Sequence, residues 1–373
     1  MTKSPNKMMG KFLALTLKRF VPLGGWALTA AALLAPAVAL ATPVYSDLYV
    51  FGDSLSDTGN LYLATGSGLL PGPREPVSPP YDDGRFSNGP LWIEDLAAKL
   101  GLGPVTPSLE GGTDYAFGGA QTGITPANPA PAQPIDLPAQ VAAFQQAITR
   151  PSPNALYTLW IGSNDVDALI DGVLAGEIMP SEISVDIAEA VGNIASAVGG
   201  LSHGGMQYLL TLNVPDLSKT PLAIATAEAV DPADPGAVLA EIQQLTQSFN
   251  GLLDPTLMDL SQTDGFHLSL VNTYAALDDI VADPGRYGFS NVTDPCWTGN
   301  DTNADSGEAC SDPDGYLFWD GLHPTAAGHR ILAHEAYQVL AVPEPAVAGM
   351  FGLGLLSVCA FVALRRRERK TFE

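Results

Sequence analysis

Short apolar runs alternate with longer stretches of helical spacing along this chain, and this alternation constrains its fold more than any other feature. A short apolar run bounded by turn residues is typical of a buried strand. Strands that alternate with helices predict a parallel sheet with helices on both faces. We expect strands at Leu48–Phe51, Asp114–Phe117, Ala155–Ile161, Tyr208–Leu212 and Phe266–Val271, and helices at 91–100, 141–148, 183–201, 235–260 and 325–340.

The middle of the chain is large, apolar and strongly acidic. The chain has 373 residues, of which 46% are hydrophobic, enough for a sizeable core. Residues 42–345 contain seven basic and 38 acidic residues. Because so acidic a body repels a phosphate backbone, we expect no nucleic acid partner.

The amino-terminal segment has the pattern of a secretory signal peptide. Five basic residues and no acidic residue precede Thr42, and the apolar stretch Leu23–Leu40 ends at the small-residue site Ala39–Ala41. This arrangement predicts a signal peptide over residues 1–41. An uncleaved anchor is the alternative.

A serine follows the first predicted strand. That strand ends at Gly52, which permits a sharp turn, and Asp53 and Ser54 come next. Ligands bind at the carboxyl ends of strands in an open α/β sheet. Ser54 is therefore a candidate nucleophile, although a serine at a strand end is more often structural and a nucleophile needs a base.

The segment Phe318–Pro324 supplies a candidate acid and base. Asp320 and His323 are three residues apart, close enough for the carboxylate to fix the tautomer of the imidazole. The other ring nitrogen is then free to take the proton of Ser54. The other histidines, predicted to be surface or packing residues, are His203, His267, His329 and His334.

Two further positions after predicted strands are suited to hold an oxyanion. Gly119 offers an unobstructed backbone N–H, and Asn164 offers a side-chain amide. Donors of this kind stabilise the negative charge that develops during acyl transfer.

Four segments resemble, in order, the conserved blocks of the GDSL (SGNH) hydrolase family. They are Gly52–Leu55, Gly118–Ala120, Gly162–Asp165 and Asp320–Pro324. The resemblance extends over roughly Asp47–Leu340, and its specificity comes from several blocks in the right order.

The resemblance implies a fold and a set of roles. The fold is a flavodoxin-like three-layer α/β/α sandwich around a mostly parallel sheet. Ser54 is implied as the nucleophile, with Asp320 and His323 completing the triad. The oxyanion hole is implied to consist of the Ser54 N–H, Gly119 and Asn164. The Gly-x-Ser-x-Gly motif of the α/β-hydrolases is absent around Ser54.

These observations predict an exported serine esterase or lipase in residues 42–341 that cleaves carboxylic esters through an acyl-enzyme, without cofactor or metal. An acyltransferase with the same triad is one alternative. A surface-binding protein that has lost its triad geometry is another. The loops 65–83 and 122–138 are expected to shape the pocket, but their sequences do not specify an acyl chain.

The carboxyl-terminal tail, residues 342–373, resembles the PEP-CTERM sorting signal. Val342–Pro345 is followed by nineteen uncharged residues, Ala346–Leu364, and then by Arg365–Arg367. A helix of that length measures about 28 Å and spans a hydrocarbon core, with the arginines on the cytoplasmic side. The resemblance implies an exosortase-like protease, and an enzyme in the periplasm, at the surface or in the extracellular matrix of a Gram-negative bacterium. A plain membrane anchor is the alternative.

Export permits a disulfide, and the positions of the cysteines favour one pairing. Cys296 and Cys310 lie close together in a polar loop, whereas Cys359 lies in the apolar tail segment. We therefore expect a bridge between Cys296 and Cys310.

The same polar loop partly matches a calcium-binding loop. Oxygen-bearing side chains occupy positions one, three, five and twelve from Asp301 to Asp312. However, the glycine comes one position late, the twelfth residue is Asp rather than Glu, and no helix is expected to flank the loop. The pattern favours a solvated acidic loop.

Overall fold

The structure is a computed structural model, and it describes residues 45–130 and 133–341. The predicted signal peptide 1–41 and the sorting tail 342–373, with its apolar segment 346–364, lie outside the described residues. Within those residues, no helix combines the length and the apolar character needed to cross a membrane.

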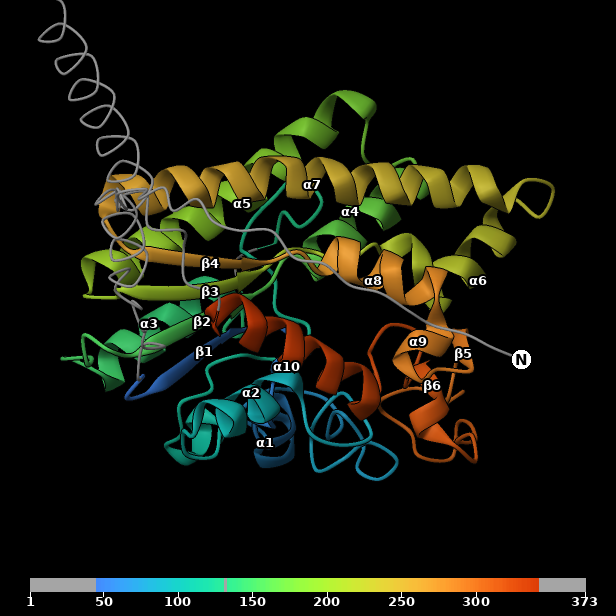
Figure 1. The fold of residues 1–373 in the computed structure, drawn as a ribbon. Helices are drawn as coiled ribbons and strands as arrows, with labels where there is room; N and C mark the ends of the chain where they lie inside the picture. Colours follow the sequence, from blue (N-terminus) through green and yellow to red (C-terminus); the bar gives the residue numbers. More distant parts are fainter. Residues whose placement is uncertain (1–44, 131–132, 342–373) are drawn as a thin grey trace, which may run out of the picture. The chain divides into compact units, whose positions relative to one another are not determined.

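A four-stranded parallel sheet with strand order β1-β2-β3-β4 forms the centre of the fold (Figure 1). In its register, Phe51 of β1 and Thr211 of β3 flank Leu159 of β2. A separate parallel pair consists of β5 and β6. The strands are β1 (Leu48–Gly52), β2 (Leu156–Trp160), β3 (Tyr208–Leu212), β4 (His267–Val271), β5 (Asn291–Pro295) and β6 (Tyr316–Phe318).

The predicted strand Asp114–Phe117 does not form a regular strand. Asp114 makes only isolated bridges, one of them parallel to Val50. The segment still lies along the outer edge of β1, since Tyr115 N–H donates to the Val50 oxygen at 2.8 Å and Phe117 N–H donates to the Gly52 oxygen at 3.2 Å. With this edge segment included, the order in space is 2-1-3-4-5, the flavodoxin-like order.

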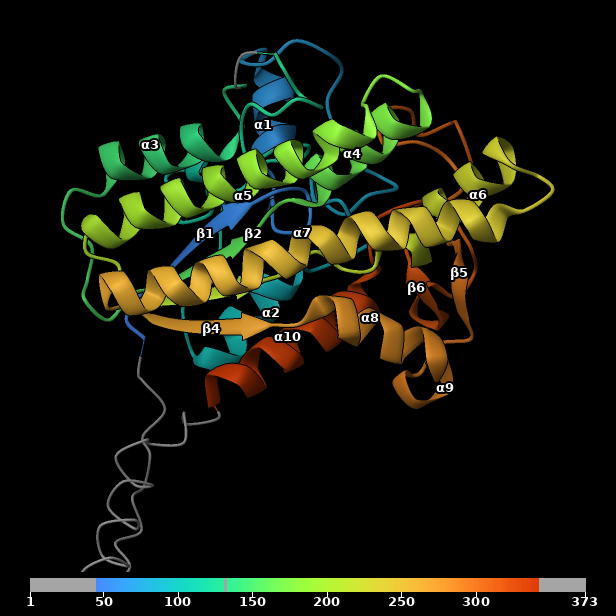
Figure 2. The ribbon, with the colours of Figure 1, turned by 90° about the horizontal axis from the view of Figure 1, so that it is seen from above.

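Helices connect the strands and cover both faces of the sheet (Figures 1 and 2). Among them, α4, α6, α8 and the short α1 and α9 are not among the predicted helices. The helices are α1 (Asn60–Ser67), α2 (Trp92–Leu100), α3 (Leu137–Ala147), α4 (Ser163–Leu174), α5 (Pro180–His203), α6 (Pro221–Val230), α7 (Pro235–Asp264), α8 (Thr273–Ala282), α9 (Pro284–Tyr287) and α10 (Ala326–Ala341).

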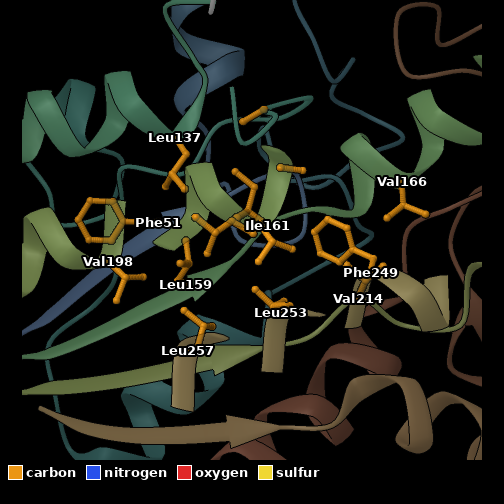
Figure 3. Close-up of a cluster of buried hydrophobic side chains, with 14 of the residues drawn as sticks. Phe51, Leu137, Leu159, Ile161, Val166, Val198, Val214, Phe249, Leu253 and Leu257 are labelled. Carbon is orange, nitrogen blue, oxygen red and sulfur yellow. The ribbon is translucent and has the colours of Figure 1, made fainter. Parts of the chain in front are cut away.

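Two hydrophobic clusters fill the spaces between the three layers. Successive residues of β1 alternate between them, so that Tyr49 and Phe51 pack with α3, α5 and α7, whereas Leu48 and Val50 pack with α2 and α10. Figure 3 shows the first cluster, in which side chains from α7 lie over the sheet. Every residue of β1 and β2 is buried, as expected for parallel strands that helices cover on both sides. The expected α/β/α sandwich is confirmed.

Candidate active site

The carboxyl end of β1 places Ser54 at the edge of the sheet. Gly52 has a φ of +155°, and a Cβ there would lie 2.3 Å from the carbonyl oxygen of Trp160 on the neighbouring strand. Only glycine fits this approach. The Gln140 side chain then fixes the strand end, because its amide bonds both the N–H and the carbonyl oxygen of Gly52, at 3.0 and 2.7 Å.

Ser54, His323 and Asp320 form a continuous chain of hydrogen bonds. His323 Nε2 lies 2.8 Å from Ser54 Oγ, and His323 Nδ1 lies 2.8 Å from Asp320 Oδ2. The side chains meet across 269 residues of sequence, and each of the three residues is at most 9% exposed. The structure thus brings together the three residues that the motifs predicted.

The turn that carries the acid and the base is held by the acid itself. Asp320 Oδ1 accepts the backbone N–H groups of Leu322, at 2.8 Å, and His323, at 2.7 Å. An aspartate that bonds the backbone two and three residues ahead stabilises such a turn. One carboxylate therefore both shapes the turn and orients the imidazole.

Burial and charge act in opposite directions on the acid and the base. Burial alone would raise the pKa of Asp320, but the charge and hydrogen bonds of His323 and a bond from Tyr81 hold that pKa below its usual value. Burial alone would lower the pKa of His323, but the charge and the hydrogen bond of Asp320 raise it above its usual value. Both shifts favour an ionised carboxylate beside the imidazole.

A hydrogen bond joins the segments that carry two of the predicted oxyanion donors, Gly119 and Asn164. Asn164 stands in the first turn of α4, just after Gly162, and its Nδ2 donates to the carbonyl oxygen of Ala120 at 2.8 Å. Gly119 has a left-handed φ of +72° and is exposed. Within the described part of the chain, the backbone N–H groups of Ser54 and Gly119 have no assigned acceptor.

A mostly apolar cavity opens beside Ser54. It is lined by Ser54, Asn164 and His323 at one side, and its non-protein space is about 710 Å³, open mouth included. Its apolar wall comes from α8, β6 and α10 and from the segment after β3, through Leu217, Leu277, Ile280, Leu317, Phe318 and Leu332.

One more carboxyl group lines this cavity. Asp53 precedes the serine and is 1% exposed, and its Oδ1 accepts the N–H of Leu55 at 3.0 Å. Burial raises the pKa of Asp53 to about 7, against the lowering effects of the Leu55 bond and the His323 charge.

Among the described residues, His323 is the one histidine that forms an ion pair with a carboxylate. His329 is completely buried, and burial lowers its pKa to about 3, as fits the packing role that the sequence predicted. His203 ends α5, His267 begins β4, and His334 lies on α10.

The acidic loop 301–312 does not gather its side chains around a point. Within the described residues, no group of three or more His, Cys, Asp or Glu side chains is placed to hold a metal ion. The Asn303 side-chain oxygen, a candidate ligand by spacing, instead accepts the N–H of Asp305 at 3.0 Å.

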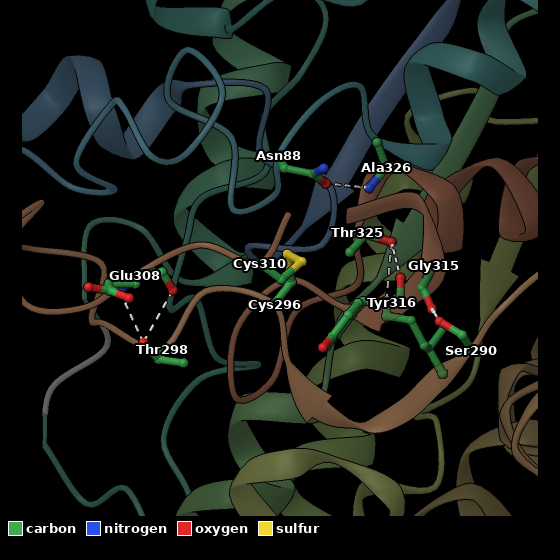
Figure 4. The surroundings of a disulfide bond; sticks show 11 residues. Asn88, Ser290, Cys296, Thr298, Glu308, Cys310, Gly315, Tyr316, Thr325 and Ala326 are labelled. Atoms are coloured by element: carbon green, nitrogen blue, oxygen red, sulfur yellow. Dashed lines mark hydrogen bonds between the residues drawn. A yellow bond between two sulfur atoms is a disulfide. The ribbon is translucent and has the colours of Figure 1, made fainter. Parts of the chain in front are cut away.

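The expected bridge between Cys296 and Cys310 is present (Figure 4). The N–H of Cys310 donates to the Cys296 oxygen at 2.7 Å, and Cys296 N–H donates to the Phe318 oxygen at 3.1 Å. The base of the loop is therefore attached to β6, two residues before Asp320.

Sequence reasoning missed two residues that support the site. Gln140 clamps Gly52, and Tyr81 donates its hydroxyl to Asp320 Oδ2 at 2.6 Å. Both contacts cross long stretches of sequence, and no local pattern around either residue indicates its partner.

A buried serine, imidazole and carboxylate bonded in series, beside backbone N–H groups without acceptors, is the arrangement found in serine hydrolases. The family model described as GDSL-like Lipase/Acylhydrolase matches residues 48–336. The chain belongs to this family, and it is a carboxylic ester hydrolase by class.

Known relatives cover most of the described region at modest identity. A phosphatidylcholine-sterol acyltransferase of Aeromonas hydrophila is 27% identical over 79% of this chain and 90% of that protein. A GDSL esterase/lipase of Arabidopsis thaliana is 29% identical over 76% of this chain and 84% of that protein. An extracellular lipase of Streptomyces rimosus of known structure is 16% identical, with 79% of this chain and 97% of that chain covered and a TM-score of 0.37.

Proposed function

We propose that this protein hydrolyses carboxylic esters of apolar acyl groups through a covalent acyl-enzyme on Ser54. The observation that carries the proposal is the unbroken chain from Ser54 Oγ to His323 Nε2 and from His323 Nδ1 to Asp320 Oδ2, each step 2.8 Å. This geometry leaves Nε2 as the acceptor and the serine hydroxyl as the donor.

In the first half-reaction, Nε2 of His323 takes the hydroxyl proton as Ser54 Oγ attacks the ester carbonyl carbon. The N–H groups of Ser54 and Gly119 and the free N–H of the Asn164 amide hold the oxyanion. Collapse of the tetrahedral intermediate breaks the bond to the alkoxide, which leaves as an alcohol with the proton from Nε2. Ser54 then carries the acyl group.

In the second half-reaction, a water molecule gives a proton to His323 as its oxygen attacks the acyl-enzyme. The second intermediate collapses, the proton returns to Ser54 Oγ, and the carboxylic acid leaves. Asp320 stays ionised throughout and stabilises the imidazolium that forms in each half-reaction. The lowered pKa of Asp320 supports this role.

The apolar lining of the cavity favours binding of the acyl chain of the substrate over binding of a charged group. Its walls on α8, β6 and α10 are aliphatic or aromatic. Burying each additional CH₂ there stabilises binding by about 0.8 kcal/mol.

The decisive experiment compares Ser54→Ala with Ser56→Ala on a panel of nitrophenyl esters and phospholipids. Ser54→Ala should lower kcat by about 10⁴-fold or more at unchanged thermal stability. Ser56 lies in the same turn, but its Oγ accepts the Trp92 indole N–H, so Ser56→Ala should lose stability and keep its chemistry. If folded Ser54→Ala retained a tenth of the activity, Ser54 would not be the nucleophile.

Transfer of the acyl group to an alcohol is a second candidate, and the name of the Aeromonas hydrophila relative favours it. The acyl-enzyme would be the same, and only the acceptor would differ. The ratio of transesterified product to free acid, measured with added alcohol or sterol, separates the two activities. The alternative of a binding protein with a disrupted triad is disfavoured by the intact hydrogen-bond chain.

We further propose that the enzyme, residues 42–341, is exported by the signal peptide 1–41. The tail 342–373 would halt transfer through its apolar segment 346–364 until a sorting protease removes it. The disulfide supports an oxidising location. Intact mass of the protein recovered outside the inner membrane tests this scheme. A species that still carries residues 346–373 would instead indicate a membrane-anchored enzyme.

A further inference from the structure

The loop between α1 and α2 reaches across the fold to the acid of the triad. Tyr81, in this loop, is 3% exposed, and its hydroxyl donates to Asp320 Oδ2 at 2.6 Å across 239 residues of sequence. The proposed ester hydrolysis by Ser54, His323 and Asp320 does not itself require this contact.

The two oxygens of Asp320 share one partner, His323 Nδ1, which lies 3.0 Å from Oδ1 and 2.8 Å from Oδ2, and they differ in the others. Oδ1 accepts two backbone N–H groups of its own turn, from Leu322 and His323. Oδ2 accepts only side-chain donors, the Tyr81 hydroxyl at 2.6 Å and His323 Nδ1 at 2.8 Å. The phenol and the imidazole therefore share one carboxylate oxygen, and it is the oxygen nearer to His323 Nδ1.

Aromatic packing and the loop backbone fix the position of the phenol. The Tyr81 ring makes edge contacts with Trp319, with 6.1 Å between centroids, and with Phe86, with 6.2 Å. Phe86 in turn packs on the His323 ring at 5.1 Å. The Ser78 hydroxyl donates to the Tyr81 carbonyl oxygen. A ring held on two sides presents its hydroxyl at little entropic cost.

The same loop is bonded to the segment that follows the base. The Ser87 hydroxyl donates to the Pro324 oxygen at 2.9 Å, and the Asn88 side-chain oxygen accepts the N–H of Ala326 at 2.8 Å (Figure 4). The tyrosine and the Asp320–His323 turn are thus parts of one bonded unit.

We propose that Tyr81 is a positioning residue of the proposed ester hydrolase: it holds Asp320 Oδ2 against His323 Nδ1 and withdraws part of the carboxylate's charge from the imidazole. The inference rests on the proposed function. Ser54, His323, Asp320 and Tyr81 then form a relay of four side chains in which the phenol moderates the basicity of His323 Nε2.

The direction of this effect follows from charge. The Tyr81 bond is among the interactions that lower the pKa of Asp320. Burial, and then the charge of Asp320, raise the pKa of Tyr81, so the phenol stays protonated and remains a donor. Without it, more negative charge would face the imidazole, and the pKa of His323 would rise further.

The test is Tyr81→Phe, which keeps the ring and removes only the hydroxyl. We expect kcat to fall about tenfold, in keeping with the loss of one hydrogen bond to a charged group, with KM little changed. The acidic limb of the kcat/KM profile should move to higher pH. Tyr62→Phe is the matched control, because the Tyr62 hydroxyl belongs to the adjoining α1 and accepts from Arg74 in the same loop. It should leave both kcat and the pH profile unchanged.

A double-mutant cycle shows whether the phenol acts through the acid. In an Asp320→Asn background, Tyr81→Phe should have little further effect, since its target is already lost. A full tenfold loss in that background would overturn the inference. So would a Tyr81→Phe enzyme with lower thermal stability but an unshifted pH profile, because that result indicates packing alone.

A ring-fluorinated tyrosine at position 81 tests the same point in the opposite direction, and it is decisive if Tyr81→Phe does not fold. The more acidic phenol is a stronger donor, so the acidic limb should move to lower pH. An unchanged profile would overturn the inference. Ser54→Ala in the same assay separates the two proposals: if it is inactive while the Tyr81 variants match the wild type, only the role of Tyr81 fails.

Discussion

At the scale of single residues, Asn164 makes a structural contact and has a proposed chemical role. Its Nδ2 donates one hydrogen to the Ala120 oxygen, which ties the start of α4 to the loop that holds Gly119. A side-chain amide has two hydrogens, so the other is free to point into the cavity that Asn164 lines with Ser54. The bond to Ala120 thus pre-orients the donor proposed for the oxyanion.

Asn164→Ala should lower kcat by about 10²–10³-fold and leave KM nearly unchanged, because an oxyanion donor acts mainly in the transition state. Steady-state kinetics on one short-chain ester, with thermal unfolding of the same sample, measures both parts. Gln121→Ala is a suitable control, since Gln121 Nε2 donates to the backbone oxygen of Asn164 at 3.2 Å and not to its side chain, while Gln121 Oε1 accepts from Asn128. A collapse in stability with a normal kcat for the folded fraction would show that Asn164 merely closes the turn.

The residues of the site differ in how far the sequence could predict them. Ser54, Asp320 and His323 were predictable because each lies in a short motif whose neighbours fix its geometry locally. Asp320, for example, accepts the N–H groups of Leu322 and His323 within its own turn. Tyr81 was not predictable, because its partner lies 239 residues away and a tyrosine in a Gly- and Pro-rich loop has no local signature.

At the scale of elements, strands were predicted better than short helices. Tyr208–Leu212 is confirmed residue for residue, because a parallel strand buried along most of its length is a nearly continuous apolar run. The edge segment 114–117 failed as a strand, since only isolated bridges hold it. Helix α4 was not predicted, because its first residues, Ser163–Asp165, are typical of a turn.

Loss of the disulfide between Cys296 and Cys310 should affect the active site. Cys296 and Cys310 pack with Tyr81, Trp297 and Trp319 in one buried cluster. Trp297 N–H also donates to the oxygen of Trp319, the residue before the acid. The bridge therefore fixes the surface against which the Tyr81 ring packs.

Replacing both cysteines by serine should lower the free energy of unfolding by about 3 kcal/mol. The bridged residues are 14 apart in sequence, and this value is the entropic contribution expected from closing a loop of that length. It should also lower kcat moderately, because the Tyr81 ring loses part of its support. Denaturant unfolding and ester turnover of the double variant give both values. Wild-type protein under a strong reductant is the control and should behave in the same way. Equal stability of the oxidised and reduced wild type would contradict the prediction.

At the scale of the whole molecule, the chain carries far more carboxyl groups than it can pair. Only seven basic residues accompany 38 acidic ones between residues 42 and 345. Several carboxyl groups are buried, and burial raises the pKa of Asp53 to about 7, that of Asp165 to about 7 and that of Asp57 to about 6. Such groups make the stability of the fold depend on pH.

Stability and activity should respond to pH in opposite directions. A carboxyl group with a raised folded pKa stays protonated in the native state while the unfolded chain ionises, so its contribution to stability is full below the unfolded pKa and is lost as pH rises toward 7. Tm should therefore fall steadily between about pH 5 and pH 8. The raised pKa of His323 gives a loss of stability of the same sign. Yet His323 must be neutral to accept the Ser54 proton, so kcat/KM should rise over the same interval.

Asp165→Asn should flatten the Tm profile and leave the activity profile in place, because Asp165 bonds only Thr122. Calorimetry and ester turnover in matched buffers measure both curves. A Tm that climbs from pH 5 to pH 8 would show that the buried carboxyl groups ionise at their ordinary pKa in the folded protein.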